Sequence, residues 1–495
     1  MKLLKIKNTD LTTGCIWKTV LKFSLPVLLS FILQNLYNMA DAAICGQTLS
    51  AYDVAGVNDT GSISFLFLQF AFGCTAGMST LLAENIGKRD DAAIKKSFAT
   101  QLKMSAFICV LLTATGLITL DPLLSMIGIE KASGAQTNAA LYNAAHDYMT
   151  VIISGIFALY MYNFIVCTLR SMGDSLTPLI FLVVSSALNI ALDLLFIIPC
   201  KMGVTGAALA TVISQLVAAV GCFVYALKRY PVLRLSAKDF KPDVKYDLKT
   251  LGRGVPLGLQ FSILAFGLIS LANGVVKFDK DPLGVIVPQA PAQNGFAAAN
   301  KVFNLFALFP NALGTAFISF ISQNHGAGKT ERIRKGYAQI LLIMTAVCTV
   351  GIGLCFLLTI NDAYLYIFLS ADKITPQSAD YGFKFLLSHL PMIYILGILV
   401  ISRNTVQGLG KPLFPLLAGV AELAARILIC MFLPQIVNGA PIDCTASGNA
   451  FLMLCFADPL AWFAADLVLV PAAVYYILKK PKAPPQNEAE TPQTV

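Results

Sequence analysis

Residues 179–199 read LIFLVVSSALNIALDLLFIIP, a run in which Asp193 is the single charged side chain. A helix of about 20 apolar residues is long enough to cross the roughly 30 Å hydrocarbon core of a bilayer. Comparable runs occupy residues 104–120, 341–360 and 461–478. The chain is therefore predicted to cross a membrane several times.

The composition of the 495-residue chain agrees with a membrane location. Hydrophobic residues make up 57% and charged residues 13%, with a mean hydropathy of +0.72, whereas a soluble domain averages about 25% charged residues. A transmembrane barrel would show short alternating segments instead of long apolar runs, so the predicted fold class is an all-α integral membrane protein. Twelve transmembrane helices are expected, at residues 20–46, 55–84, 98–120, 140–170, 177–199, 203–227, 250–277, 294–323, 336–361, 378–408, 412–434 and 450–478.

Lysine and arginine are distributed unevenly between alternate loops. Of the 36 basic residues, 27 lie on the side that also holds both termini. The opposite loops hold Lys131, Lys201, Lys277, Lys280 and Lys373. Because loops rich in Lys and Arg stay in the cytoplasm, we expect a multi-pass protein of the plasma (inner) membrane with both termini cytoplasmic. The net charge of +9 then reflects topology and contact with anionic lipid, and no nucleic-acid partner is expected.

The two halves of the chain resemble each other. The motif NIGK at residues 85–88 recurs as NHG at residues 324–326, the pair Gly173 and Pro178 recurs 237 residues later, and Pro26 recurs 230 residues later. Chance matching of apolar helices would not align Gly, Pro and polar residues. We therefore expect two pseudo-symmetric six-helix lobes related by an axis along the membrane normal, with substrate at their interface.

This repeat predicts the domain organisation of the chain. The longest basic and polar stretch separates six spans from six, and the end of the chain is rich in Pro, Gln and Glu, a composition typical of disorder. The expected units are a cytoplasmic N-terminal segment (1–19), an N-lobe (20–227), a cytoplasmic linker (228–249), a C-lobe (250–478) and a disordered tail (479–495).

Asp41 and Asp193 lie deep within the first and fifth spans. Charges in the hydrocarbon region are costly and usually functional, and both acids are expected roughly 8–9 Å below the outer boundary at 1.5 Å per residue. Thr211 and Tyr148 reach a similar level, and Asn189 shares a helical face with Asp193. Since two close carboxylates disfavour double ionisation, we interpret this group as a site for Na⁺ or a proton. A structural polar network between helices is the alternative.

Span one carries further polar residues near Asp41. Gln34, Tyr37 and Asn38 form a polar stripe with it and are expected to support the site. Pro26, earlier in the span, removes a helical hydrogen bond and permits a kink. The kink is either a static packing feature or a hinge.

The repeat is imperfect where the deep acids lie. Asp41 and Asp193 align with Leu271 and Cys430, so the second half lacks both. The deep charged residues of the second half are Glu422, Arg426 and Asp466. Arg426 is expected to neutralise both of these acids in a structural ion-pair network, with a role in lining or gating the substrate path as the alternative. Acids at outer helix ends, such as Asp279, are expected to be solvated.

The chain lacks the usual signatures of an enzyme or a cofactor site. It has no G-x-x-x-x-G-K-[ST] loop, no Ser/His/Asp or paired Cys/His arrangement, and no metal-ligand spacing among His146, His325 and His389. Its 12 cysteines form no C-x-x-C pair, although Cys200 and Cys444 lie near outer helix ends where a bridge is conceivable. We expect a non-enzyme without a cofactor, driven by an ion gradient or by a separate protein.

Over residues 18–478 the chain resembles the multidrug and toxic compound extrusion (MATE) family. The resemblance rests on LP at 25–26, YNMAD at 37–41, LRSMGDSLTP at 169–178, LNIALD at 188–193 and GVTGAALAT at 203–211. It implies two lobes around a V-shaped cleft, and export of cationic or amphipathic drugs and toxins in exchange for Na⁺ or H⁺. It assigns the N-lobe cation site to Asp41, Asn189, Asp193 and Thr211, with Tyr148 nearby. Residues 257–276 and 385–402 lack the acids that some branches carry there, so the chain resembles a branch that couples through the N-lobe.

Three other readings stay open. A flippase of the same superfamily, for lipid-linked oligosaccharides or peptidoglycan precursors, should carry several basic residues for pyrophosphate, but Arg426 and Arg403 are the main deep ones. A membrane-embedded enzyme and a non-transporting scaffold are the alternatives from other classes. The expected partners are small-molecule substrates and membrane lipid, with a monomer as the default state.

Overall fold

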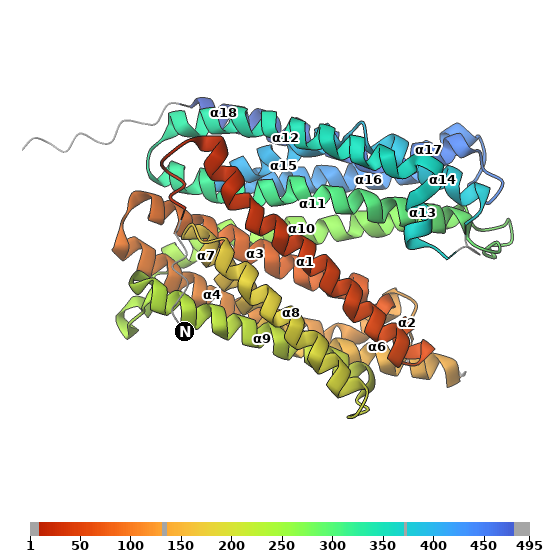
Figure 1. The fold of residues 1–495 in the computed structure, drawn as a ribbon, viewed down its shortest axis with the longest axis horizontal. Helices are drawn as coiled ribbons and strands as arrows, with labels where there is room; N and C mark the ends of the chain where they lie inside the picture. The colour runs from red at the N-terminus through yellow and green to blue at the C-terminus, as the bar shows by residue number, and fades with distance from the viewer. Residues whose placement is uncertain (1–8, 131–135, 371–373, 480–495) are drawn as a thin grey trace, which may run out of the picture.

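The computed structural model describes residues 9–130, 136–370 and 374–479, which form a long bundle of helices (Figure 1). In these ranges the regular structure is helical apart from one antiparallel bridge between Lys280 and Ile286. The all-α prediction is confirmed. The expected disordered tail lies outside the described residues from position 480 onward, as do the first eight residues of the N-terminal segment.

Helices follow the predicted order in both halves. The first half contains α1 (Ile16–Thr48), α2 (Ala51–Asp59), α3 (Gly61–Lys88), α4 (Asp91–Ile118), α5 (Leu120–Met126), α6 (Gln136–Ser154), α7 (Ile156–Ser171), α8 (Leu176–Ile197) and α9 (Gly203–Arg229). After the short helices η1 (Pro231–Leu233) and η2 (Ala237–Phe240), the second half contains α10 (Val244–Lys277), α11 (Pro291–Gly326), α12 (Thr330–Thr359), η3 (Ile360–Asp362), α13 (Ala363–Phe368), α14 (Pro376–His389), α15 (Ile393–Gly408), α16 (Leu413–Asn438), α17 (Gly448–Cys455) and α18 (Ala457–Leu478).

By length and composition, ten helical segments of the described chain can cross a membrane, and two bent pairs raise this to twelve. The pairs are α6 with α7, bent by 45°, and α14 with α15, bent by 49°. Each was expected as one continuous span. The first break falls at Gly155, where a side chain would overlap Val212 of α9, so glycine permits close packing there but weakens the helix.

The linker between the two halves is shorter in the structure than predicted. Residues 244–249 belong to α10, because Asp243 caps that helix and accepts a hydrogen bond from the Tyr246 N–H at 3.0 Å. Capping by Asp satisfies a free N–H group and lets a helix begin in a polar stretch. A hydropathy profile cannot place such a start, because the first turns of α10 lie outside the apolar run.

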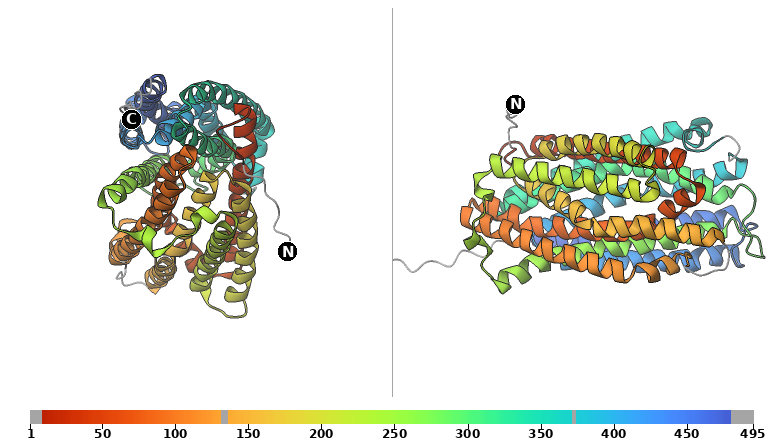
Figure 2. Two further views of the ribbon diagram at one scale, coloured as in Figure 1. Left: turned by 90° about the vertical axis from the view of Figure 1, so that its left-hand side faces the viewer. Right: turned by 90° about the horizontal axis from the view of Figure 1, so that it is seen from below.

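The helices of the two halves form two neighbouring bundles that spread apart toward one end (Figure 1). We call the end at which α1 begins and α18 finishes the terminal end, and the opposite one the far end. α3 packs against α10 and α11 of the other bundle. α1 belongs to neither bundle alone, since it packs against α11 and α12 and also against α8, and it crosses from one bundle to the other (Figures 1 and 2).

A reciprocal glycine contact joins the bundles at the terminal end. A Cβ atom at Gly87 would overlap the carbonyl oxygen of Gln323, and one at Gly326 would overlap that of Glu84. The two contacts are related by the internal repeat, since both partners shift by 239 positions. Beside them, Arg253 Nη2 lies 2.6 Å from Glu84 Oε2. The terminal ends of the two bundles are therefore in direct backbone contact.

Two further expectations are tested by local structure. All 12 cysteines are free thiols, so Cys200 and Cys444 form no bridge. Asp279 is fully buried rather than solvated, because its carboxylate accepts hydrogen bonds from the N–H groups of Ala292 and Gln293, both at 2.8 Å. Both residues lie in the first turn of α11, whose free N–H groups favour a negative charge.

Candidate cation site

Asp41 and Asp193 meet near the far end of the first bundle. Asp41 lies seven residues before the end of α1 and Asp193 four before the end of α8, or about 10 Å and 6 Å along the helix axes. Asp193 is fully buried, and Asn189, one turn earlier on α8, is 1% exposed. Packing of α1 on α8 turns these side chains inward.

The two carboxyl groups lie close enough to interact directly. An ionised carboxylate has no donor, so the two groups can hydrogen-bond to each other only with one proton between them. Two carboxyls in contact also disfavour simultaneous ionisation. The geometry therefore suits a pair that carries one negative charge when a single proton is bound.

Asn189 connects this pair to α9. With its amide oriented to satisfy both of its polar atoms, Asn189 Nδ2 donates to Asp193 Oδ2 at 3.3 Å, and Oδ1 accepts from the Thr211 N–H at 3.2 Å. Asn189 thus positions Asp193 relative to the backbone of α9, while the Thr211 hydroxyl lies beside the Tyr37 phenol.

The other predicted residues divide into two groups. Tyr37 and Tyr148 lie close to both acids, so α1, α6, α8 and α9 all contribute to the cluster, as the depth count predicts. Gln34 and Asn38 are exposed on α1. Cys45, one turn after Asp41, also lies near both carboxyls. It was not singled out, although its i+4 spacing from Asp41 was a usable signal.

Two oxygens of the pair are available to a ligand. Asp41 Oδ1 and Asp193 Oδ1 are buried and have no hydrogen-bond partner. Hard cations prefer oxygen ligands, and buried carboxylates are stabilised by a counter-charge. Among the described residues no group of three or more His, Cys, Asp or Glu side chains could hold a metal ion.

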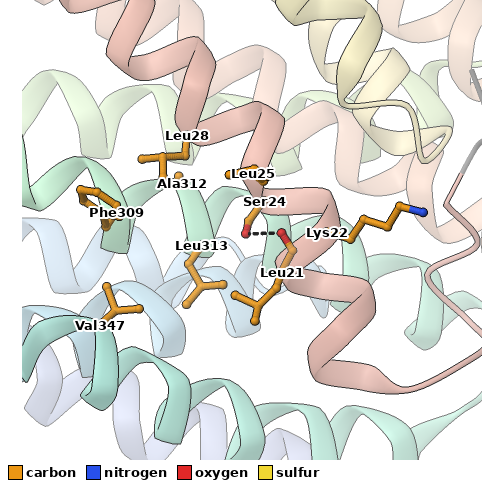
Figure 3. A pocket seen from close by; sticks show the side chains of 9 residues that line it. All are labelled: Leu21, Lys22, Ser24, Leu25, Leu28, Phe309, Ala312, Leu313 and Val347. Atoms are coloured by element: carbon orange, nitrogen blue, oxygen red, sulfur yellow. Dashed lines mark hydrogen bonds between the residues drawn. The ribbon is translucent and has the colours of Figure 1, made fainter. Parts of the chain in front are cut away.

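Pro26 lies inside α1 beside a cavity. The cavity has a volume of about 370 Å³ and separates α1 from α11 and α12 (Figure 3). Its wall is formed by Leu21, Lys22, Ser24, Leu25 and Leu28 of α1, and by Phe309, Ala312, Leu313 and Val347. Since these α1 residues surround Pro26, the first half of α1 has room to move at the one position where its ladder lacks a hydrogen bond.

The charged network of the second bundle differs from the expected one. Arg426 Nη2 lies 3.2 Å from Glu422 Oε1, as predicted, but Arg426 Nε lies 2.5 Å from Asp458 Oδ1. Arg403 Nη2 lies 2.8 Å from Glu422 Oε2. Asp466 makes no ion pair with Arg426, and its Oδ1 is buried without a partner. The prediction that Arg426 neutralises Asp466 is wrong, because Asp458 takes that place.

His389 completes this network, a role that was not predicted from the sequence. Its Nε2 lies 3.5 Å from Asp458 Oδ2, and its Nδ1 lies 2.9 Å from Ser388 Oγ. His389 is fully buried at the break between α14 and α15, and Asp458 is the second residue of α18, just after the break at Phe456. The sequence does not show where these helices break. The positions of His389 and Asp458 beside the breaks could therefore not be predicted from it.

A family comparison identifies this architecture. The model of the MatE family matches residues 26–195 and 294–432, which cover both halves and include Asp41, Asp193 and Arg426. The solved structure described as an "outward-facing conformation of a multidrug resistance MATE family transporter of the MOP superfamily" is similar with a TM-score of 0.79 over 95% of this chain and 98% of that chain, at 20% identity. At this identity the likeness shows the fold.

Curated relatives point to the same family. "Probable multidrug resistance protein YpnP" of Bacillus subtilis (strain 168) is 27% identical over 66% of this chain and 69% of its own length. A protein of Shewanella oneidensis named "FAD transporter" is 26% identical over 88% of this chain and 90% of its own length. The chain belongs to the MatE family of multidrug efflux transporters, multi-pass proteins that move small molecules across membranes.

Proposed function

We propose that the chain is a secondary active antiporter that exports cationic or amphipathic small molecules in exchange for H⁺ or Na⁺. The coupling ion binds the N-lobe pair Asp41 and Asp193, with Asn189, Thr211, Tyr37 and Tyr148 around it. No resident cofactor is needed, because the ion is cargo. The observation that carries this proposal is the close approach of two carboxyl groups on different helices, each with a buried and unpartnered oxygen.

The proposed topology follows from charge. Basic residues gather in the loops of the terminal end, so that end faces the cytoplasm of the inner membrane and the far end faces outward. The lobes of the monomer are joined at the terminal end, so this conformation is open toward the outside, the side on which the two acids lie. A proton or Na⁺ entering there neutralises the pair, and the cation drives export only if it and the substrate favour different conformations.

Pro26 provides the link from the site to the lobes. α1 carries Asp41 in its second half, and Val20 and Phe23 of its first half belong to the hydrophobic core of the C-lobe. A charge change at Asp41 alters how strongly the second half is held to α8. Bending at Pro26 into the neighbouring cavity then changes the position of α1 against α11 and α12.

The flippase alternative is not favoured by the charges. Arg426 and Arg403, the deep basic residues named for it, are paired with Asp458 and Glu422. A pyrophosphate would have to displace those carboxylates. The relatives are named for multidrug resistance and FAD transport, so the substrate panel should contain both a cationic dye and FAD.

The test is transport in vesicles. Liposomes that contain the purified protein are loaded with ethidium or FAD. Flux of the compound is then followed under an imposed pH gradient, an imposed Na⁺ gradient, or neither. We expect flux with one of the two ions, and loss of that flux in Asp41→Asn. Asp59→Asn serves as the matched control, because Asp59 is an exposed acid at the C-terminal end of α2.

Either of two results would sink the proposal. One is full gradient-driven flux in Asp41→Asn; the other is flux in the wild type that ignores both gradients. Loss of flux in Asp59→Asn would instead show that the assay reports general damage at the far end.

A further inference from the structure

The C-lobe contains a buried charged cluster at the position equivalent to the N-lobe site. α8 begins at Leu176 and α16 at Leu413, and this shift of 237 positions matches the repeat of Gly173 and Pro178. It places Asn189 opposite Arg426 and Asp193 opposite Cys430. The amide of one lobe is thus an arginine in the other.

The equivalent position on the first helix of each lobe supports this pairing. The prolines of α1 and α10 are 230 positions apart, which places Tyr37 opposite Gly267. A Cβ atom at Gly267 would overlap Arg426 Nη1. The C-lobe therefore has no side chain where the N-lobe has a phenol, and the Arg426 guanidinium occupies that room.

Both clusters contain two carboxyl groups, but only the C-lobe cluster contains a basic side chain that balances their charge. In the N-lobe, no basic side chain of the described residues forms an ion pair with Asp41 or Asp193, and the pair keeps two unpartnered oxygens. In the C-lobe, Arg426 lies between two carboxylates, 3.2 Å from Glu422 Oε1 and 2.5 Å from Asp458 Oδ1. Arg426 is 3% exposed, so its charge is shielded from solvent.

We propose that Arg426 is a built-in cation that permanently fills the C-lobe counterpart of the N-lobe cation site. Arginine stays protonated in proteins, so this charge cannot leave during a transport cycle. The C-lobe cluster then keeps one charge state while the N-lobe pair loads and releases its ion. This inference rests on the proposed function, because it takes the N-lobe pair as the exchangeable site.

The test moves the exchangeable site between the lobes. Equilibrium binding is measured on detergent-purified protein, both as bound ²²Na⁺ and as protons taken up after a pH jump. Asp41→Asn should abolish the signal, and adding Arg426→Gln should restore one of wild-type size by freeing Asp458. Adding Asp458→Asn to that pair should remove it again. Arg426→Lys in the Asp41→Asn background keeps a fixed charge and should restore nothing.

A reciprocal variant tests the idea without disturbing the C-lobe. Tyr37→Gly with Asn189→Arg copies the C-lobe arrangement into the N-lobe and should eliminate exchangeable cation binding. The inference is overturned if this variant binds cations like the wild type, or if Asp41→Asn with Arg426→Gln folds and binds none. An undiminished signal in Asp41→Asn alone contradicts the proposed function instead, so the two failures are distinguishable.

Discussion

Asp193 is completely buried, and it lies beside a second carboxyl group, that of Asp41, and beside the amide of Asn189. A buried acid with a second acid next to it is unusual inside an apolar helix. Asn189 orients Asp193 by joining its Oδ2 to the Thr211 N–H. The Thr211 hydroxyl, in contrast, reaches Tyr37 on α1. Side chain and backbone of the same residue thus stabilise two different sides of the site.

Thr211→Val should weaken cation binding without abolishing it. The change removes a hydroxyl group beside Tyr37, and one side-chain hydrogen bond is worth about 1 kcal/mol or roughly fivefold in affinity. It keeps the backbone N–H that bonds Asn189. Ion-dependence of ethidium flux should show a higher half-saturating ion concentration with an unchanged maximum. Thr345→Val is the control, because the Thr345 hydroxyl bonds the Leu341 carbonyl of its own helix. Equal effects of both changes would contradict the role of Thr211.

The residues that sequence reasoning identified and missed differ in one physical respect. Asp41, Asp193 and Thr211 lie in long apolar runs, so their depth follows from counting turns. Asp458 lies beside a helix break and Glu84 near a helix end. Their burial depends on Arg426 and Arg253, partners that lie far away in sequence, and a hydropathy pattern carries no information on such pairs.

Helix α1 is the element that physically connects the cation site with the opposite bundle. It runs unbroken from Ile16 to Thr48 with Pro26 inside it, and it packs against helices of both halves. The sequence predicts this helix and its proline, but not that it crosses between bundles. The crossing depends on packing with α11 and α12, which a single-helix pattern does not encode.

Pro26→Ala should slow export while leaving cation binding intact. Alanine restores the missing hydrogen bond and stiffens the helix beside the cavity, so the bend becomes costlier. We expect flux to fall by about tenfold or more, since conformational steps often limit turnover, with an unchanged ²²Na⁺ or proton binding signal. Pro471→Ala changes an exposed proline inside α18 and should leave flux unaltered. Wild-type flux in Pro26→Ala would rule out the hinge.

At the scale of the molecule, the internal repeat produces a symmetric closure of the terminal end. Gly87 fits against Gln323 and Gly326 against Glu84, so each lobe uses the same two positions against the other. The motif repeat NIGK and NHG is visible in the sequence, and it predicts two related lobes. It does not reveal that the repeated glycines touch, because the contact lies across the axis between the lobes.

Gly326→Ala should shift the protein toward a conformation that is open at the terminal end. The new methyl group overlaps the Glu84 carbonyl, so the closed contact cannot form without separating the lobes. Spin labels at Asp91 and Lys335 in a cysteine-free background should report a longer distance in this variant. Gly353→Ala is the control, because a Cβ atom there meets open space. An unchanged distance distribution in Gly326→Ala would show that this contact does not hold the closed state.

The most direct test of the central claim is the count of coupling ions released when substrate binds. Detergent-purified protein, loaded with protons or with ²²Na⁺, is mixed with ethidium, and the released ion is measured. The account predicts release by the wild type and none by either Asp41→Asn or Asp193→Asn, with ethidium still bound by both variants. Release of the same amount of ion by those variants would contradict the claim that this carboxyl pair couples the ion to export.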